Sequence, residues 1–198
     1  MEPCRRTAIS ILGATLLAAT FAGGALLNAA AKTDDNSDRE YYQAQAYGTG
    51  TQMGKTVNVS ILINEYSTPD DQKLLMNAFN TKGMNGLVRA LEKMKSKGRI
   101  SITGALGYDV AYIRSFKTED GRRIRMATNR PITFAENYGM TRSTDYSMSA
   151  VELNLQDDMD KSTGTLLPLC RLTVNKKTNE IEIEAFQNPW TLRQIQKR

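Results

Sequence analysis

The chain contains 198 residues, with 26 basic and 21 acidic side chains, a formal net charge of +5 and no histidine. The absence of histidine excludes Ser-His-Asp and Cys-His catalytic arrangements and nearly all catalytic zinc sites, so we expect a protein that is not an enzyme. The basic excess is small and spread along the chain, which is too weak a charge pattern for a nucleic-acid-binding surface.

The N-terminal segment has the pattern of a signal peptide. Two basic residues, Arg5 and Arg6, precede an uncharged run of 25 residues that ends on the small residues Ala29 and Ala31, as signal peptidase requires. An uncleaved membrane anchor is the alternative, because a run of this length can span a bilayer. Many of its residues are Ala, Gly and Thr, which insert weakly. The pattern therefore favours cleavage of residues 1–31 and an exported protein, periplasmic or secreted, without a stable membrane span.

The 167 residues that follow the leader can form one domain with its own core. Residues 32–54 are polar and Gly-rich without an apolar period, which predicts a disordered lead-in. Residues 55–198 are predicted to form the single domain. Cys170 is the one cysteine after residue 31, so the processed chain has no intramolecular disulfide, and its apolar neighbours predict a buried structural thiol.

The first regular pattern of the domain is a strand followed by helices. Valine and isoleucine alternate with polar residues over 56–63, which predicts a half-buried strand. Thr68, followed by a proline and two aspartates, predicts the start of a helix that ends at Gly83. A second helix is expected from about residue 85 to 96, and the short connection predicts an αα pair.

The rest of the chain alternates with the period of a β-strand. The Asp120-Gly121 pair is a strong hairpin signal between two such segments. The tail, residues 188–195, is compatible with a final strand or a short helix. Together these patterns predict an α+β fold, in which an antiparallel β-sheet of about seven strands has an αα pair inserted after the first strand. The further predicted strands cover 99–103, 108–116, 122–128, 151–155, 165–174 and 180–186.

The segment 129–147 is the longest stretch without an apolar period, and it is our candidate ligand-binding site. Loops of this length in compact domains often act as lids or binding loops, and Met and aromatic side chains offer adaptable apolar contacts. A plain connection packed on the end of the sheet is the alternative. The candidate ligand-binding residues are Phe134, Tyr138, Met140, Arg142 and Tyr146.

The turn 158–164 places oxygen-bearing side chains at alternate positions, as a calcium loop does. Its glycine comes one position late, and Leu169 occupies the twelfth position, where such a loop needs a glutamate. We therefore predict a solvated turn, no metal site and no cofactor.

The order of elements resembles that of the helix-grip and fatty-acid-binding folds. This resemblance implies a helical pair that caps a curved sheet around an apolar cavity. Helix-grip domains end in a long helix, however, and 188–198 is too short for one. The chain also looks like exported bacterial proteins of uncharacterised function, a resemblance that implies no activity. The segments that carry it are 63–68, 98–100, 127–132, 143–146 and 188–192.

These observations lead to two functional hypotheses. The first is an exported, non-enzymatic binding module for an apolar or amphiphilic envelope ligand, with a lipid or other amphiphile as its partner. The alternative is a structural or interaction protein of the cell envelope, with a filled core and another envelope protein as its partner. A cavity of several hundred Å³ would favour the first hypothesis, and a filled interface between sheet and helices would favour the second.

Overall fold

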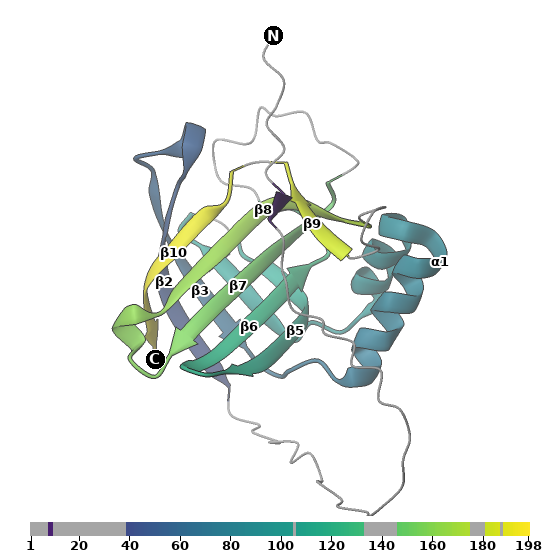
Figure 1. Ribbon diagram of the computed structural model, residues 1–198, viewed down its shortest axis with the longest axis horizontal. Coiled ribbons are helices and arrows are strands. Elements are labelled where there is room, and N and C mark those ends of the chain that lie inside the picture. The colour runs from purple at the N-terminus through teal and green to yellow at the C-terminus, as the bar shows by residue number, and fades with distance from the viewer. Residues whose placement is uncertain (1–7, 10–38, 105, 133–145, 175–180, 187) are drawn as a thin grey trace, which may run out of the picture.

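Eight antiparallel strands close into a barrel in the computed structural model, which describes residues 8–9, 39–104, 106–132, 146–174, 181–186 and 188–198. Successive strands pair with one another around the barrel, and the last gap closes because β8 pairs with both β7 and β10 (Figure 1). In sheet order the barrel strands are β2 (Glu40–Tyr47), β3 (Thr56–Ile63), β4 (Gly98–Ile102), β5 (Tyr108–Thr118), β6 (Gly121–Thr128), β7 (Met148–Gln156), β8 (Thr163–Val174) and β10 (Trp190–Lys197).

One further strand, β9 (Ile181–Ala185), extends the sheet beyond the barrel. Strand β8 pairs with β7 along one edge. Along its other edge, residues 164–166 pair with β10 and residues 170–174 pair with β9. The two-residue strand β1 (Ala8–Ile9) pairs with β9. Two short 3₁₀ turns, η1 (Gly50–Gln52) and η3 (Met159–Lys161), lie in the β2–β3 and β7–β8 connections.

Apolar side chains fill the barrel. Alternation along each strand turns every second residue inward, and all eight barrel strands contribute to one buried apolar cluster. An eight-stranded barrel is just wide enough for side chains to fill its interior, so this cluster is the main core of the molecule. Its most deeply buried members include Tyr42, Ile61, Ile100, Ile124, Leu153 and Leu192, each no more than 1 % exposed.

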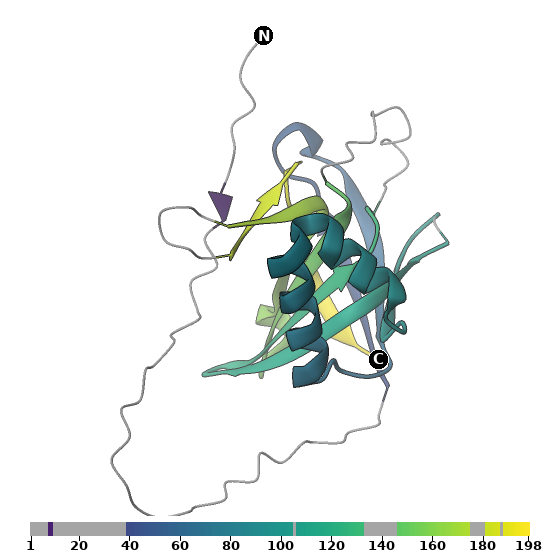
Figure 2. The ribbon, with the colours of Figure 1, turned by 90° about the vertical axis from the view of Figure 1, so that its right-hand side faces the viewer.

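The helix α1 (Pro69–Lys93) lies across the outside of the barrel (Figure 2). The side chain of Thr68 accepts a hydrogen bond from the Asp71 N–H, and the Asp71 carboxylate accepts one from the Thr68 N–H, so a capping box forms at the predicted start of the helix. Gly83 has a φ of +59° and kinks α1 at the residue where the sequence predicts the first helix to end. The apolar side of both segments forms a second cluster against the outer wall.

The predicted α+β class is wrong. The sheet is closed instead of open, it contains more strands than the seven expected, and a single kinked helix takes the place of the αα pair. The strands predicted between residues 56 and 128 do form β3 to β6, and the predicted strands 165–174 and 180–186 form β8 and β9. Closure of the barrel depends on β2 and β10, the two strands that the sequence patterns mark least clearly.

Strand β2 lies within the segment predicted as a disordered lead-in, so the folded unit extends N-terminal to the predicted boundary at residue 55. Its inward side chains are Glu40, Tyr42, Ala44 and Ala46. These inward positions hold a carboxylate, a phenol ring and two methyl groups instead of the valine and isoleucine that usually mark a strand.

The tail forms a final strand, β10, which is one of the two predicted alternatives; a break in its alternation explains why the sequence left a short helix open. Gln194 has a φ of +52°, and the pairing of β10 with β2 shifts register between Arg193 and Gln196. The buried positions are therefore Trp190, Leu192 and Ile195, a spacing that neither a regular strand nor a regular helix produces.

Candidate functional site

An apolar cleft of about 290 Å³ lies between α1 and the outer wall of the barrel. Leu75, Phe79, Leu87 and Leu91 of α1 line it, and each of them is more than nine-tenths buried. These four residues come from both sides of the kink, so both segments of the helix contribute (Figure 2). Met76 also lines the cleft but is 37 % exposed, so the cleft opens to solvent near the start of α1.

The floor of the cleft is one cross-strand row on the outer face of the barrel. The row runs through Tyr112 of β5, Ala127 of β6, Ala150 of β7 and Leu167 of β8, each the register partner of the next. The two central residues carry only a methyl group, whereas the two outer ones are large. The volume beneath α1 therefore exists because Ala127 and Ala150 leave it unfilled.

The next row along the same face is polar. Two residues further along each strand, roughly 7 Å away, the row runs through Arg114, Arg125, Glu152 and Thr165, of which the last three line the cleft. Arg125 Nε donates to Glu152 Oε2 at 2.7 Å, and Arg114 Nη1 donates to Gln72 Oε1 of α1 at 2.7 Å. We call Gln72, Arg114, Arg125 and Glu152 the polar rim. The cleft thus combines an apolar interior with charged groups at one border.

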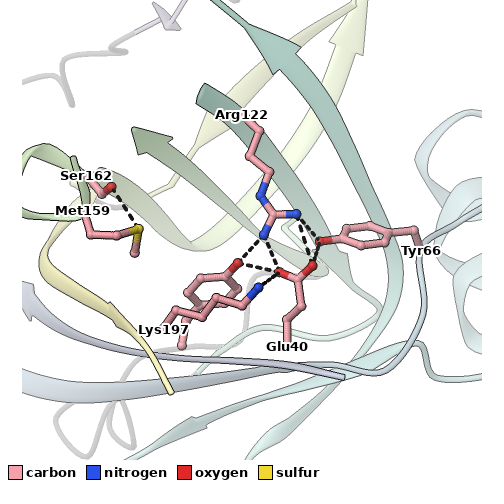
Figure 3. A network of polar contacts seen from close by, with 7 residues as sticks. Glu40, Tyr66, Arg122, Met159, Ser162 and Lys197 are labelled. Atoms are coloured by element: carbon pink, nitrogen blue, oxygen red, sulfur yellow. Dashed lines mark hydrogen bonds and ion pairs between the residues drawn. The ribbon is translucent and has the colours of Figure 1, made fainter. Parts of the chain in front are cut away.

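A separate polar network closes one end of the barrel (Figure 3). Glu40 of β2 and Arg122 of β6 face each other there, with Arg122 Nη2 at 2.5 Å from Glu40 Oε2. The hydroxyls of Tyr42 and Tyr66 both donate to the Glu40 carboxylate and both accept from Arg122. Lys197 Nζ lies 3.9 Å from Glu40 Oε2. The Glu40 side chain is 8 % exposed, so its charge is paired within the protein.

The protonation states in this network are fixed near neutral pH. Burial alone would raise the pKa of Glu40, but hydrogen bonds from Arg122 and Tyr42 and the positive charges of Arg122 and Lys197 lower it below its ordinary value. Burial, together with the adjacent Glu40 carboxylate, raises the pKa of Tyr42 and that of Tyr66. None of these groups is therefore poised to exchange a proton near pH 7.

The network is best explained as a polar cover over one end of the apolar barrel core. Met159 of η3, whose sulfur accepts a hydrogen bond from Ser162 at 3.8 Å, packs against the interior apolar cluster at the same end of the barrel (Figure 3). An ion pair with every partner satisfied can cover the end of an apolar core without leaving buried polar groups unpaired.

A second hollow, of about 790 Å³, lies between η3 and the end of β10. Polar side chains such as Lys161, Thr163 and Arg193 make up much of its lining. Water satisfies such groups as well as a ligand does, so this hollow is the weaker candidate for a binding site.

The predicted site is only partly described by the structure. Phe134, Tyr138, Met140 and Arg142 lie outside the described residues. Tyr146, the fifth predicted residue, does not line the cleft. Its hydroxyl donates to Glu184 Oε1 at 2.9 Å, and its ring packs 5.0 Å from that of Phe186 and 4.9 Å from the Arg171 guanidinium.

Cys170 is buried, as predicted. It belongs to the apolar cluster between α1 and the outer wall, and its exposure is 0 %. Burial raises the pKa of its thiol to about 12, which leaves almost no thiolate near neutral pH. The residue therefore contributes packing rather than reactivity.

The cleft was not predicted, although one signal for it is present in the sequence. The run 165–170 is almost continuously apolar, which is typical of a strand covered on both faces. Leu166 faces the interior cluster and Leu167 the helix. The small outward residues Ala127 and Ala150 give no sequence signal, because their role depends on the pairing of β6 with β7. These two strands are separated in the sequence by 19 residues.

No family model, no curated protein sequence and no solved structure matches this chain. Within the described ranges, no helix is long and apolar enough to cross a membrane. In that same part of the chain, cysteine, aspartate and glutamate side chains do not gather in groups of three or more that could hold a metal ion. The functional argument therefore rests on the geometry of the cleft.

Proposed function

We propose that this protein binds an apolar or amphiphilic small molecule between α1 and the outer wall of the barrel, as a binding module rather than an enzyme. The observation that carries the proposal is the cleft of about 290 Å³ with an apolar interior and a polar rim. Small-molecule sites typically measure roughly 300–1,000 Å³ and combine apolar walls with a few polar groups that orient the ligand. Closed antiparallel barrels are common scaffolds for such modules.

The proposed ligand lies outside the barrel interior. Side chains of all eight barrel strands fill that interior, and the Glu40–Arg122 network covers one of its ends. The space beneath α1, by contrast, is bordered by a helix held mainly through its apolar face. A helix of this kind can shift to admit a ligand at less cost than strands of a closed barrel can separate.

We further propose that the module works in the cell envelope. The signal-peptide pattern of residues 1–31 supports export after cleavage at Ala31. Envelope compartments contain abundant amphiphiles, which is consistent with an apolar site that opens to solvent.

The filled barrel interior favours the alternative function, that of a structural or interaction protein of the envelope. Two large apolar side chains near the cleft are also exposed, Leu74 of α1 at 51 % and Phe116 of β5 at 39 %. In that case a side chain of a partner protein, instead of a small molecule, would occupy the cleft.

Binding of an uncharged solvatochromic dye such as Nile red to the delipidated protein tests the proposal. The wild type should bind one dye per chain with saturation. Ala150→Phe should abolish binding because it places a ring on the floor of the cleft. Gln43→Phe is the matched control, since it adds the same ring to an exposed position of β2 on the opposite side of the barrel.

Loss of binding in Ala150→Phe alone supports a small-molecule site in the cleft. Absence of dye binding in the wild type, or equal binding by all three proteins, contradicts it. In either of those cases the interaction-protein hypothesis becomes the better explanation of the filled barrel.

A further inference from the structure

We propose that the ligand of the cleft is a single-chain amphiphile with an anionic head group, which Arg114 and Arg125 bind while the chain lies over Ala127 and Ala150. This inference rests on the proposed function and adds the charge and the shape of the ligand. It follows from the distribution of charge around the polar rim, from the donors that remain available there, and from the size of the cleft.

The outer face beside the cleft carries a surplus of positive charge. Arg114, Arg123 and Arg125 stand on adjacent strands in two neighbouring rows, and Glu152 is the one acidic residue in those rows. Glu152 accepts from Arg125 at 2.7 Å and lies 3.7 Å from Arg123 Nε, so one carboxylate serves two guanidinium groups. An anion at the rim would offset the remaining repulsion between like charges.

The acidic residues of the first turn of α1 are already engaged. Asp70 pairs with Lys73 at 3.2 Å, and Asp71 pairs with Lys97 at 3.4 Å as well as completing the helix cap. These ion pairs supply partners for both acids within the start of α1 and the adjoining segment.

An aromatic ring holds two of the arginines together. The guanidinium carbons of Arg114 and Arg125 lie 5.6 Å and 5.7 Å from the centroid of the Phe116 ring. Such contacts favour a defined position for each cation. Phe116 is 39 % exposed, and both guanidinium groups contact its ring.

Arg125 lines the cleft and keeps hydrogen-bond donors that no described residue uses. Its Nε binds Glu152, whereas neither Nη atom has a protein hydrogen-bond acceptor among the described residues. The side chain is 33 % exposed and lines the cleft. A guanidinium in this state can donate two parallel hydrogen bonds to one carboxylate or phosphate group.

The size of the cleft limits the apolar part of the ligand to one chain. A cavity of roughly 150 Å³ holds one benzene molecule. A cleft of about 290 Å³ therefore holds about twice as many carbon atoms, which corresponds to one aliphatic chain of medium length. A chain lying on the floor row would reach the polar rim within roughly 7 Å, the spacing of alternate residues along a strand.

Calorimetric titration with four ligands of equal chain length tests the inference: dodecanoate, dodecyl phosphate, dodecanol and dodecyltrimethylammonium, the ionic ligands below their critical micelle concentrations and dodecanol below its solubility limit. The two anions should bind at least about tenfold more tightly than dodecanol, because hydrogen bonds between a guanidinium and an anion are stronger than those to a neutral hydroxyl. High salt should reduce this preference. The comparison of the two anions tells whether the head group is a carboxylate or a phosphate.

Arg125→Met should reduce the preference for the anions over dodecanol about tenfold. The variant should fold, since Glu152 keeps its ion pair with Arg123. Arg193→Met, at an exposed position of β10 that lines the second hollow and not the cleft, is the matched control and should bind as the wild type does.

The outcomes separate the two proposals. If none of the four ligands binds, the proposed function fails. If dodecanol binds as tightly as the anions, or if the cation binds best, the cleft is an apolar site and the inference of an anionic ligand is overturned. Anion preference that persists unchanged in Arg125→Met overturns the assignment to the rim.

Discussion

Substitution of Ala150 by isoleucine should stabilise the protein while it reduces ligand binding. Ala150 lies at the centre of the cleft floor, beside Ala127 and opposite the apolar side of α1. Isoleucine suits a β-strand and points the additional atoms into space that the native sequence leaves empty. The substitution therefore separates the requirements of packing from those of binding.

The size of the effect follows from the volume available. Isoleucine adds three carbon atoms, and the burial of each contributes about 0.8 kcal/mol. Fixing its rotamer costs about 0.5–1 kcal/mol, so the free energy of unfolding should increase by about 1.5–2 kcal/mol. The cleft of about 290 Å³ is large enough to accept the side chain without displacing α1. For a chain of this size the change corresponds to an increase in Tm of about 3–8 °C.

Urea denaturation followed by circular dichroism measures the change in stability, and dye titration of the same samples measures binding. The reasoning predicts opposite changes in the two quantities. A destabilised Ala150→Ile protein would refute it, because overpacking costs about 1–3 kcal/mol and occurs where no space exists. Gln43→Ile, at an exposed position of β2 outside the cleft lining, provides the comparison for β-propensity alone.

Three other predictions follow from the remaining features. Glu40→Gln should lower the free energy of unfolding by about 3 kcal/mol at pH 7, because it leaves Arg122, 31 % exposed, without its counter-charge. The pKa of Glu40 is lower in the folded protein than its ordinary value of 4.5, so the stability that the carboxylate provides is present above pH 4.5. This stability is lost as the pH falls through the folded-state pKa. Denaturation measured between pH 7 and 3 should show the loss in the wild type and not in Glu40→Gln. Cys170→Ser should cost about 1–3 kcal/mol in thermal or chemical denaturation, since it places a hydroxyl in an apolar site, and rapid labelling of the native thiol would contradict its burial. Protein recovered from its native compartment should begin at or near Lys32 by N-terminal sequencing, and recovery of residues 1–31 in a membrane fraction would indicate an anchor instead.

Local signals in the sequence predict most of the individual strands but not their closure. The Asp120-Gly121 turn and the capping residues around Thr68 act over a few positions, so they can be recognised without knowing the fold. Whether a sheet closes depends on its first and last strands. In this chain those strands are β2, which packs tyrosine and alanine inward, and β10, which a bulge at Gln194 interrupts.

The candidate site was not predicted because it depends on pairing between distant segments. Ala127 and Ala150 are ordinary small residues until the register of β6 and β7 places them side by side beneath α1. Arg114, Arg123 and Arg125 likewise gather only after the β5–β6 hairpin and β7 align. The loop site at 129–147 was predicted from composition alone, and composition does not show where the folded protein leaves a volume unfilled.

The division of apolar side chains into an interior cluster and an outer cluster gives the molecule two levels of local stability. Barrel amides can exchange with solvent only when the closed sheet opens, whereas those of α1 can exchange whenever the outer cluster separates and the helix detaches as a cooperative unit. A ligand bound between the helix and the wall stabilises the attached state, so it should slow hydrogen exchange in α1 more than in β2 or β3. Occupancy of the cleft can thus be read from the protection of a helix, even where the ligand itself escapes detection.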